Sequence, residues 1–285
     1  MRIPVEAIVK KYAACDQCKG ELIMAKDKAR CASCGREILI RDERLFFSDP
    51  PPIEENKKSP HYQDWSPQRK AHYDFFERTL PTGTDLALLD VGAGPTQFRK
   101  LFLRFASYVG LDFYPYSHVS VVSDVSKHLP LKSEVFDIVV LSNLLEHVPD
   151  AQTVLTEAYR VLKQGGVCCA TIPFLMRVHQ APYDFNRFTL YQLQRLFENA
   201  GFRNVQVEPL GLPMDVYRSM QRHFFGHLLD ALKAKGGVSG LLLYPLAQGA
   251  RILMSALFRI FKLLYAMAMP NERYTEGYGI RAKKA

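Results

Sequence analysis

Residues 86–95 read Leu-Ala-Leu-Leu-Asp-Val-Gly-Ala-Gly-Pro. The first six form a short apolar run with one acid near its end, a pattern typical of a strand buried on both faces. Two glycines follow within three residues, where a chain can turn sharply into a helix and where a ligand can approach the backbone. Dinucleotide-binding turns and purely structural turns share this pattern, so the segments that follow must decide its meaning.

Strand and helix patterns alternate along the chain around this turn. Apolar runs predict strands at 86–91, 107–112, 119–123, 136–141, 166–172 and 203–208. Helical spacing of apolar residues predicts helices at 96–105, 151–162 and 189–200. Such alternation is typical of a mostly parallel sheet with helices on both faces, so the expected fold class is α/β.

Four of the six cysteines form two CxxC pairs, and 12 residues separate the pairs. Thiolates at this spacing can complete a tetrahedral shell around Zn²⁺, and four protein ligands leave no open position, so the metal would be structural. Disulfides or free thiols are the alternative, which the absence of an apolar secretory run disfavours because the cytosol keeps thiols reduced. The predicted zinc ligands are Cys15, Cys18, Cys31 and Cys34.

The segment around the second pair, residues 20–47, resembles a small zinc-ribbon family. That family includes the activator subunit of certain tRNA and protein methyltransferases. In its pattern a short strand and a turn follow the ribbon, here at Glu37–Asp42. The sequence therefore predicts an N-terminal zinc ribbon.

Further motifs follow the glycine turn in a fixed order. Gly110–Asp112 ends the second predicted strand, Ser123–Asp124 follows the third, and FDIVVLSNLLEHV (136–148) and RVLKQGG (160–166) come next. This order resembles the class I S-adenosylmethionine-dependent methyltransferase family, over residues 86–208, and implies a Rossmann-like seven-stranded sheet. A dehydrogenase is not indicated, because the turn lacks GxGxxG and the LEHV and RVLKxGG motifs have no place there.

The resemblance implies that S-adenosyl-L-methionine is the cofactor. Asp112 would bind the ribose hydroxyls, and Asp124 would bind the adenine amino group unless it is only a turn residue. Pro95 and Thr96 replace the family's third glycine, which a helix start tolerates. The resemblance also implies residues that border the methionine part of the cofactor and residues that line the floor of the site. All the implied cofactor-binding residues together are Asp90, Gly92, Gly94, Asp112, Asp124, Ser142 and Asn143.

The loop after the fifth predicted strand is dense in His, Asp, Arg and aromatic residues. It reads IPFLMRVHQAPYDFNRFT (172–189) and lies where ligands of such sheets bind. It resembles a methyltransferase subgroup tied to bacterial cell-surface polysaccharide or lipid-linked sugar synthesis. That resemblance implies O-methylation of a hydroxyl on a glycan or lipid-linked precursor, whereas a structural Asp184–Arg187 ion pair is the alternative. The candidate catalytic residues, with both histidines and the aspartate as candidate bases, are His147, His179, Asp184 and Arg187.

The net charge of +8 arises entirely in the last quarter of the chain. Residues 1–215 hold 26 basic and 26 acidic side chains, whereas residues 216–285 hold 11 basic and 3 acidic ones among many Leu, Phe and Met. This composition favours peripheral contact with an anionic membrane over contact with nucleic acid; packing on the domain or a homodimer interface is the alternative. A predicted helix there carries a narrow polar stripe made of Gln248, Arg251, Ser255, Arg259 and Lys262.

Four parts are therefore expected, in a cytoplasmic protein that contacts the inner face of the membrane. Residues 277–284 resemble the last strand of the methyltransferase family, which makes the preceding apolar, basic segment a helical insertion. An RNA methyltransferase with a zinc ribbon and a non-catalytic methyltransferase-fold scaffold remain alternative functions. The parts are a ribbon at 1–48, a Pro-rich linker at 49–65, a methyltransferase domain at 66–215 plus 272–285, and the insertion at 216–271.

Overall fold

One sheet connects the N-terminal and C-terminal parts of the chain. The structure is a computed structural model that describes residues 3–50, 65–95, 98–235, 237–268 and 274–285. Within these residues eleven strands hydrogen-bond in the order β1-β2-β3-β4-β7-β6-β5-β8-β9-β11-β10. In chain order they are β1 (Leu22–Ala25), β2 (Lys28–Cys31), β3 (Glu37–Arg41), β4 (Arg44–Phe46), β5 (Ala87–Val91), β6 (Ser107–Asp112), β7 (Val119–Val122), β8 (Phe136–Ser142), β9 (Leu162–Pro173), β10 (Arg203–Leu210) and β11 (Gly277–Lys283).

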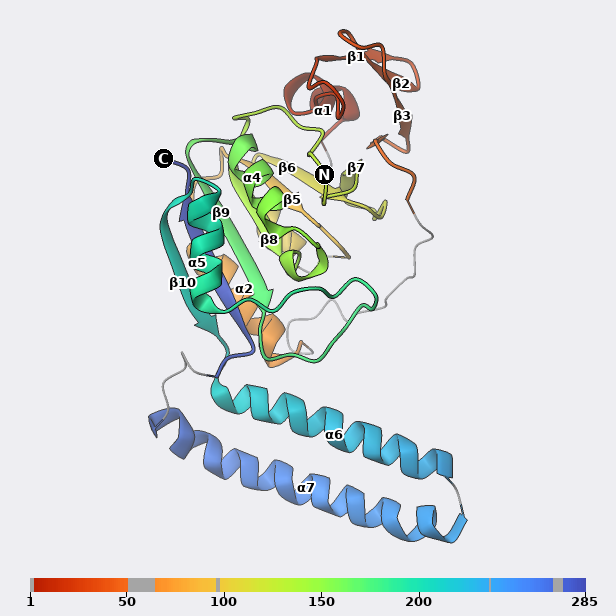
Figure 1. Cartoon of the computed structure of the whole chain (residues 1–285), viewed down its shortest axis with the longest axis vertical. Helices are drawn as coiled ribbons and strands as arrows, with labels where there is room; N and C mark the ends of the chain where they lie inside the picture. The colour runs from red at the N-terminus through yellow and green to blue at the C-terminus, as the bar shows by residue number, and fades with distance from the viewer. Residues whose placement is uncertain (1–2, 51–64, 96–97, 236, 269–273) are drawn as a thin grey trace.

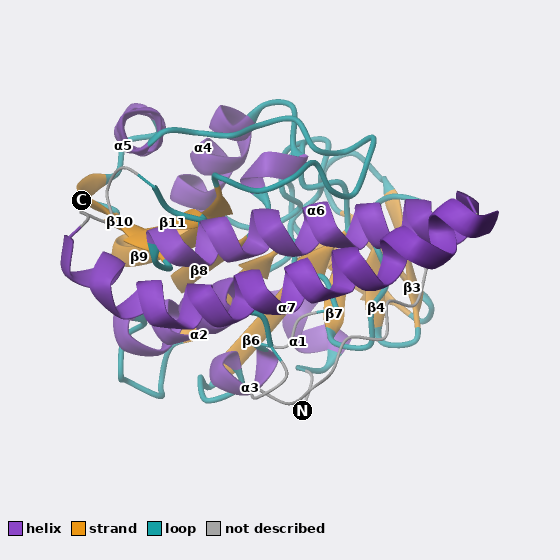
Figure 2. Ribbon diagram, turned by 90° about the horizontal axis from the view of Figure 1, so that it is seen from below, coloured by secondary structure: helices purple, strands orange, loops and turns teal. Residues whose placement is uncertain are grey.

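Helices cover both faces of the sheet, with α4 and α5 on one face and α2 and α3 on the other (Figures 1 and 2). The predicted α/β class is confirmed, and the central part of the sheet, from β4 to β9 in sheet order, is parallel. The predicted helix at 96–105 is reduced to α3, and residues 96–97 and most of the predicted linker lie outside the described residues. The helices are α1 (Val5–Lys11), α2 (Pro67–Thr79), α3 (Arg99–Phe102), α4 (Ala151–Val161), α5 (Leu190–Asn199), α6 (Pro213–Lys235) and α7 (Gly237–Ala268).

The sheet has eleven strands, not the seven expected. Seven of them, from β7 to β10 in sheet order, come from the α/β part of the chain. The four N-terminal strands join them because β4 pairs in parallel with β7, Leu45 with Val121 and Phe46 with Val122. Pairing supplies partners for backbone groups that an edge strand would otherwise expose. These four strands, β1 to β4, are here called the ribbon strands. They extend the sheet rather than form a separate one.

Alternate side chains of the central strands build two apolar cores. Leu89 and Val139 face the core that includes α1, α4 and α5, whereas Leu88 and Ile138 face the aromatic residues of α2 and α3. All five residues of β5 are buried. Burial on both faces explains why this strand is an apolar run rather than an alternating one.

Side-chain caps position the two helices that flank the candidate site. Asp150 accepts hydrogen bonds from the backbone N–H groups of Gln152 and Thr153 at the start of α4. Thr189 accepts one from the backbone N–H of Gln192 at the start of α5. Each cap supplies a partner for a backbone donor that the first turn of a helix leaves unpaired.

Helices α6 and α7 form an antiparallel pair, here called the helical hairpin (residues 213–268). It is inserted between β10 and β11 and lies beside the sheet rather than on either face (Figure 1). The two helices lie side by side in both views (Figure 2). Among the described residues, no helix combines the length and the apolar character needed to cross a membrane.

Glu157 on α4 connects the ribbon to the rest of the chain. Its side chain is 4% exposed and lies 3.7 Å from Lys19 Nζ. The carboxylate accepts hydrogen bonds from the backbone N–H of Leu129 and from two guanidinium nitrogens of Arg160. Burial acts to raise the pKa of Glu157, but the Arg160 and Lys19 charges lower it to about 2. A carboxylate with this many donors stabilises the fold when ionised.

We expect Glu157 to make the stability of the fold depend on pH. Its pKa is lower in the folded chain than the ordinary 4.5, so its contribution is full above about pH 4.5 and is lost as pH falls toward about 2. Glu157→Gln should lower the free energy of unfolding by about 3 kcal/mol at pH 6, and the difference from wild type should shrink at pH 3. Urea denaturation measures both, with the exposed Glu198→Gln as control. A pH-independent difference would contradict the expectation.

Candidate functional site

The glycine turn after β5 brings backbone donors to the end of β6. Gly92 and Gly94 both have positive φ, +70° and +50°. A Cβ at residue 92 would lie 2.7 Å from the Leu144 side chain, so only glycine fits there. The Gly94 N–H donates to Asp112 Oδ2 at 2.8 Å. The two predicted glycines therefore shape the turn around the predicted ribose-binding carboxylate.

Asp112 lies at the end of β6 with its carboxylate almost fully buried. Oδ1 accepts a hydrogen bond from the Tyr114 N–H at 2.8 Å, which complements the Gly94 bond to Oδ2. Burial raises its pKa, and the backbone N–H groups act in the opposite direction. Each carboxylate oxygen has a second acceptor position, so the group can still accept two hydroxyls.

Asp90 lies deeper than Asp112. It is 1% exposed and accepts a hydrogen bond from the Tyr108 hydroxyl at 2.9 Å. Burial raises its pKa to about 7, against the lowering effect of the Tyr108 hydrogen bond. The place of Asp90 beside the methionine part of the cofactor stays a prediction.

Asp124 follows β7 and forms a local turn. Its Oδ1 accepts hydrogen bonds from the Ser126 backbone N–H at 3.0 Å and from the Ser126 hydroxyl at 2.6 Å. Lys127 lies 3.2 Å from Oδ2. Burial acts to raise its pKa, but Ser126 and Lys127 together lower it. Asp124 thus forms the local turn that was its alternative role. Its binding of the adenine amino group stays a prediction.

Ser142 and Asn143 end β8 beside this group of acids. Asn143 has positive φ, and its Nδ2 lies 3.2 Å from Nδ1 of His72, a buried residue of α2. Burial lowers the pKa of His72 to about 4, so its ring is neutral near pH 7. Asn143 Oδ1 is buried without a hydrogen-bond partner among the described residues. An orphaned amide oxygen of this kind suits a donor group on a bound ligand.

The four predicted catalytic residues come together on the same side of the sheet. The rings of His147 and His179 lie edge to face with centroids 4.9 Å apart. His179 Nδ1 is 3.3 Å from Asp184 Oδ2, and Arg187 donates to both oxygens of Asp184 at 2.6 and 2.8 Å. Sequence spacing alone left 31 residues between the two histidines, and the loop after β9 brings them into contact.

The ion pair changes what each member of this cluster can do. The Arg187 guanidinium holds the pKa of Asp184 well below its usual range, so this carboxylate is a weak base. The Asp184–Arg187 ion pair weighed as the structural alternative is present, while the catalytic roles stay predictions. Burial, and then the neighbouring His147, lower the pKa of His179. A neutral His179 has a ring nitrogen available to accept a proton or bind a ligand.

Two candidate functional residues, Glu146 and His72, were not predicted from the sequence. Glu146, in the 3₁₀ turn η2 (Leu145–His147), is fully buried, and burial raises its pKa to about 8. Glu146 belongs to the LEHV motif together with Leu145 and His147. The local sequence, however, does not show that its side chain is buried. His72 has no local signal either, because its contact with Asn143 joins segments 71 residues apart.

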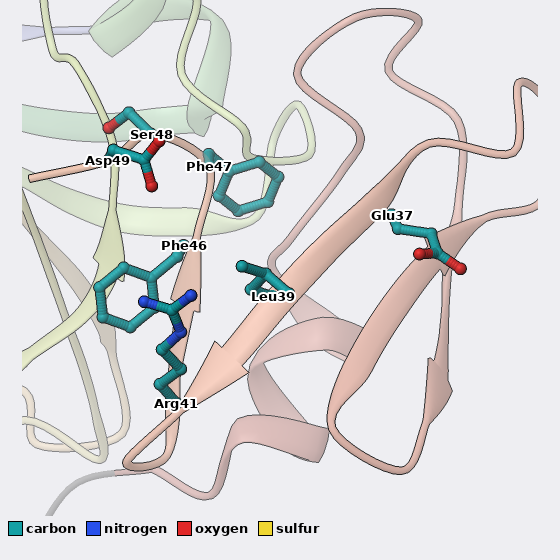
Figure 3. Close-up of a pocket in the computed structure, with 7 residues that line it drawn as sticks. All are labelled: Glu37, Leu39, Arg41, Phe46, Phe47, Ser48 and Asp49. Carbon is teal, nitrogen blue, oxygen red and sulfur yellow. The ribbon is translucent and has the colours of Figure 1, made fainter.

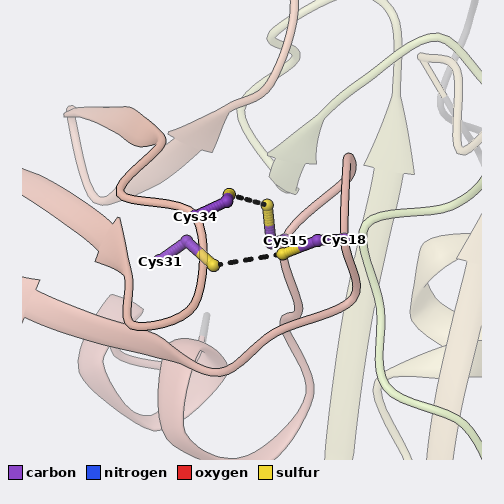
Figure 4. A group of neighbouring side chains, drawn as sticks. All are labelled: Cys15, Cys18, Cys31 and Cys34. Atoms are coloured by element: carbon purple, nitrogen blue, oxygen red, sulfur yellow. Dashed lines mark hydrogen bonds between the residues drawn. The ribbon is translucent and has the colours of Figure 1, made fainter.

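The four N-terminal cysteines form one cluster (Figure 4). Sγ of Cys15 lies 3.7 Å from that of Cys34, and Sγ of Cys18 lies 3.4 Å from that of Cys31. Sulfurs of a tetrahedral zinc site with bonds near 2.3 Å are roughly 3.8 Å apart, so the arrangement fits the ion. The two knuckles have the same backbone pattern, since Lys19 N–H bonds the Cys15 carbonyl and Gly35 N–H bonds the Cys31 carbonyl.

A pocket lies where the ribbon strands meet the rest of the sheet (Figure 3). Two of its lining residues are in contact, since the guanidinium of Arg41 lies 5.8 Å from the ring centroid of Phe46. None of its lining residues is a predicted cofactor, catalytic or metal residue. The lining is formed by Glu37, Leu39, Arg41, Phe46, Phe47, Ser48 and Asp49.

Comparison with known proteins assigns the part of the chain that carries these residues. Residues 89–170 match the family described as "Methyltransferase domain". This matched segment covers less than half of the chain. It contains the glycine turn, Asp112 and the LEHV motif, and the structure has the α/β methyltransferase fold around it.

Individual methyltransferases are also similar to this chain over part of its length. The chain is 30% identical over 136 residues to 2-methyl-6-phytyl-1,4-hydroquinone methyltransferase 1, chloroplastic, of Oryza sativa subsp. japonica, covering 46% of this chain and 41% of that protein. It is 32% identical over 124 residues to demethylmenaquinone methyltransferase of Anoxybacillus flavithermus, covering 33% and 52%. The matches thus span about half the length of these relatives or less.

A similar solved structure is that of a SAM-dependent methyltransferase from Archaeoglobus fulgidus. The two chains share 16% sequence identity at a TM-score of 0.49. The match covers 76% of this chain and 94% of that chain.

Asp112 provides the test of the cofactor site. Hydrogen bonds to a charged group contribute about 1.5 to 3 kcal/mol each, so Asp112→Ala should weaken the binding of S-adenosyl-L-methionine by at least about tenfold. Calorimetry on the folded variant measures the dissociation constant, with Asp85→Ala, an exposed acid before β5, as the matched control. An unchanged constant in the Asp112 variant would exclude the residue as the ribose anchor.

Proposed function

We propose that the chain is an S-adenosyl-L-methionine-dependent methyltransferase that O-methylates a hydroxyl of a glycan or lipid-linked precursor. The observation that carries the proposal is the meeting of two polar groups at one edge of the sheet. Asp112 and the glycine turn form the first group, and the His147–His179–Asp184–Arg187 cluster forms the second. Both lie at the carboxyl ends of parallel strands, where such sheets bind ligands.

The residues at this edge fit the cofactor. Asp112 would hold the ribose, Asp124 would approach the adenine, and the backbone of Gly92 and Gly94 would border the methionine part. Asn143 offers its orphaned oxygen on the same edge. When bound, S-adenosyl-L-methionine supplies the methyl group that is transferred.

The polar cluster suits the acceptor side. A hydroxyl acceptor must lose its proton as the new bond forms, so a group that assists this loss has to face it. Asp184 is committed to Arg187, so it serves best to orient His179. His147 and His179 are then the groups that would face the acceptor oxygen.

The helical hairpin supports an acceptor that carries a lipid. It leaves the sheet at the end of β10, which runs in the same direction as β9, and therefore begins at the same edge as the site. Met220, Phe224, Leu246 and Ile252 are each 65% to 68% exposed. Burial, and then the charge of Arg177 in the acceptor loop, lower the pKa of His223 on α6, as expected where the hairpin approaches that loop.

The charges of the hairpin match an anionic surface. Arg218, Arg222, Lys233 and Arg251 are exposed between the apolar side chains. Of the predicted polar stripe, Ser255 is also exposed, Gln248 is half-buried, and the side chains of Arg259 and Lys262 lie outside the described residues. Exposed apolar and basic side chains on one helix are typical of binding in the headgroup layer of a membrane.

The names of two relatives agree with a lipid-linked acceptor. One is named for a phytyl-substituted hydroquinone and the other for demethylmenaquinone. Those acceptors belong to those proteins. They make an amphiphilic acceptor a consistent choice here, at a peripheral membrane site on the cytoplasmic side.

The function is tested by following the methyl group. The chain is incubated with methyl-labelled S-adenosyl-L-methionine and a cell lysate, and we expect the label in the lipid or lipid-linked glycan fraction. Met220→Gln/Phe224→Gln should reduce both this labelling and flotation with phosphatidylglycerol vesicles at least about fivefold, because it removes exposed apolar surface. Cofactor affinity should not change. Ile23→Gln, an exposed apolar residue of the ribbon, is the control.

The other outcomes identify the alternatives. Label in RNA would replace the proposal with an RNA methyltransferase. Cofactor binding without label in any fraction would indicate a scaffold. Wild-type protein that remains at the bottom of a low-salt gradient would exclude the membrane contact.

We propose in addition that the four thiols of Cys15, Cys18, Cys31 and Cys34 hold a structural zinc ion. Metal analysis should find one zinc per chain. Cys31→Ser should lower the content at least about tenfold, because a tetrathiolate shell needs all four ligands. Cys168→Ala, which removes a buried thiol from β9, should leave the content unchanged. A folded wild-type chain purified without chelators and free of zinc would refute the assignment.

A further inference from the structure

Glu146 is a buried carboxylate without a hydrogen-bond donor. It is 0% exposed, and neither of its oxygens has a hydrogen-bond partner among the described residues. Arg187 is near enough to act on it electrostatically, but its guanidinium donates to Asp184 instead. Burying an unpaired polar group is costly, so a site that retains one calls for a partner.

The nearest candidate partner is His147, whose Nε2 lies 3.6 Å from Glu146 Oε1. The other ring nitrogen, Nδ1, bonds the backbone carbonyl oxygen of Tyr183. A carbonyl oxygen can only accept, so Nδ1 carries the hydrogen and the neutral ring keeps its lone pair on Nε2. Within the part of the chain that the structure describes, Nε2 is itself buried without a hydrogen-bond partner. Two acceptors therefore face each other, with no donor between them.

His179 joins this pair from the loop after β9. Its Nδ1 lies 3.3 Å from Asp184 Oδ2 and 3.5 Å from Arg187 Nη2. Asp184 is itself fixed by Arg187 and by the His179 backbone N–H at 2.8 Å. A carboxylate behind one nitrogen of an imidazole orients the ring so that the other nitrogen can bind a metal. Nδ1 of each histidine is thus engaged by a fixed neighbour, the Tyr183 carbonyl for His147 and the Asp184–Arg187 pair for His179.

We infer that Glu146, His147 and His179 bind a divalent transition-metal ion, a site separate from the thiolate cluster of the ribbon. One ligand atom from each residue lies within 4.8 Å of the other two. Bonds near 2.1 Å need ligand atoms roughly 3.0 to 3.4 Å apart, so the 3.6 Å between Glu146 and His147 requires only a small closure. Two imidazoles and one carboxylate are a donor set that Zn²⁺, Mn²⁺ and Fe²⁺ accept.

Three protein ligands leave open positions on the ion. A hydroxyl oxygen of the acceptor could occupy one of them, and a metal-bound hydroxyl loses its proton more readily than a free one. This role rests on the proposed function. The presence of the metal site does not.

Mn²⁺ is the appropriate probe because it prefers nitrogen and oxygen ligands and discriminates against the thiolates of the ribbon. Titration of the full chain, followed by electron paramagnetic resonance, should show one Mn²⁺ site per chain. Pulsed measurements should detect nitrogen coupling from imidazole. Glu146→Gln, which preserves shape, and His179→Ala should each weaken Mn²⁺ binding at least about tenfold. His227→Ala, on the exposed face of α6, should have no effect.

The remaining results separate the possible failures. Absence of a Mn²⁺ site, binding without nitrogen coupling, or equal affinity in all variants would overturn the inference and leave a proton shared between Glu146 and His147. Unchanged cofactor affinity in Glu146→Gln and His179→Ala shows that they remain folded. Mn²⁺ binding in a chain that transfers no methyl group would refute the proposed function and leave the metal site intact.

Discussion

Parallel pairing of β5 with β6 and β8 is the constraint on which the arrangement of the site depends. Parallel strands end at the same edge, so each connection must return along a face of the sheet before the next strand begins. The glycine turn, Asp112 and the LEHV turn follow three different strands and still meet. The loop after β9 joins them for the same reason, which places His179 against His147.

Two buried glutamates of this framework, Glu157 and Glu146, differ in their hydrogen-bond partners and in the direction of their pKa shifts. Glu157 accepts hydrogen bonds from Leu129 and Arg160, which lower its pKa to about 2 despite burial. Glu146 is more deeply buried and its carboxylate oxygens have no hydrogen-bond partner among the described residues, so burial raises its pKa to about 8. The first is a satisfied ion that connects the ribbon to α4. The second is an unsatisfied group beside two imidazoles, and groups with perturbed pKa values in a cluster are typical of functional sites.

The chain carries an addition at each end of the parallel sheet. At one end, β4 pairs with β7 and continues the sheet into the ribbon. At the other, the helical hairpin leaves from β10 and returns through β11, beside the acceptor loop. The ribbon therefore stabilises an edge of the sheet, whereas the hairpin is placed to influence what reaches the site.

Local residue patterns determined the parts of this protein whose physics is local. The CxxC pairs, the glycine turn, the strand runs and the Thr189 cap depend on neighbours a few residues away, and the structure contains each of them. The parallel register of β4 with β7 depends on segments some 75 residues apart. The residues of a strand do not by themselves indicate which distant strand it pairs with. The inward side chain of Glu146 and the contact of His72 with Asn143 were likewise decided by tertiary packing, because burial and electrostatics depend on what surrounds a residue in space.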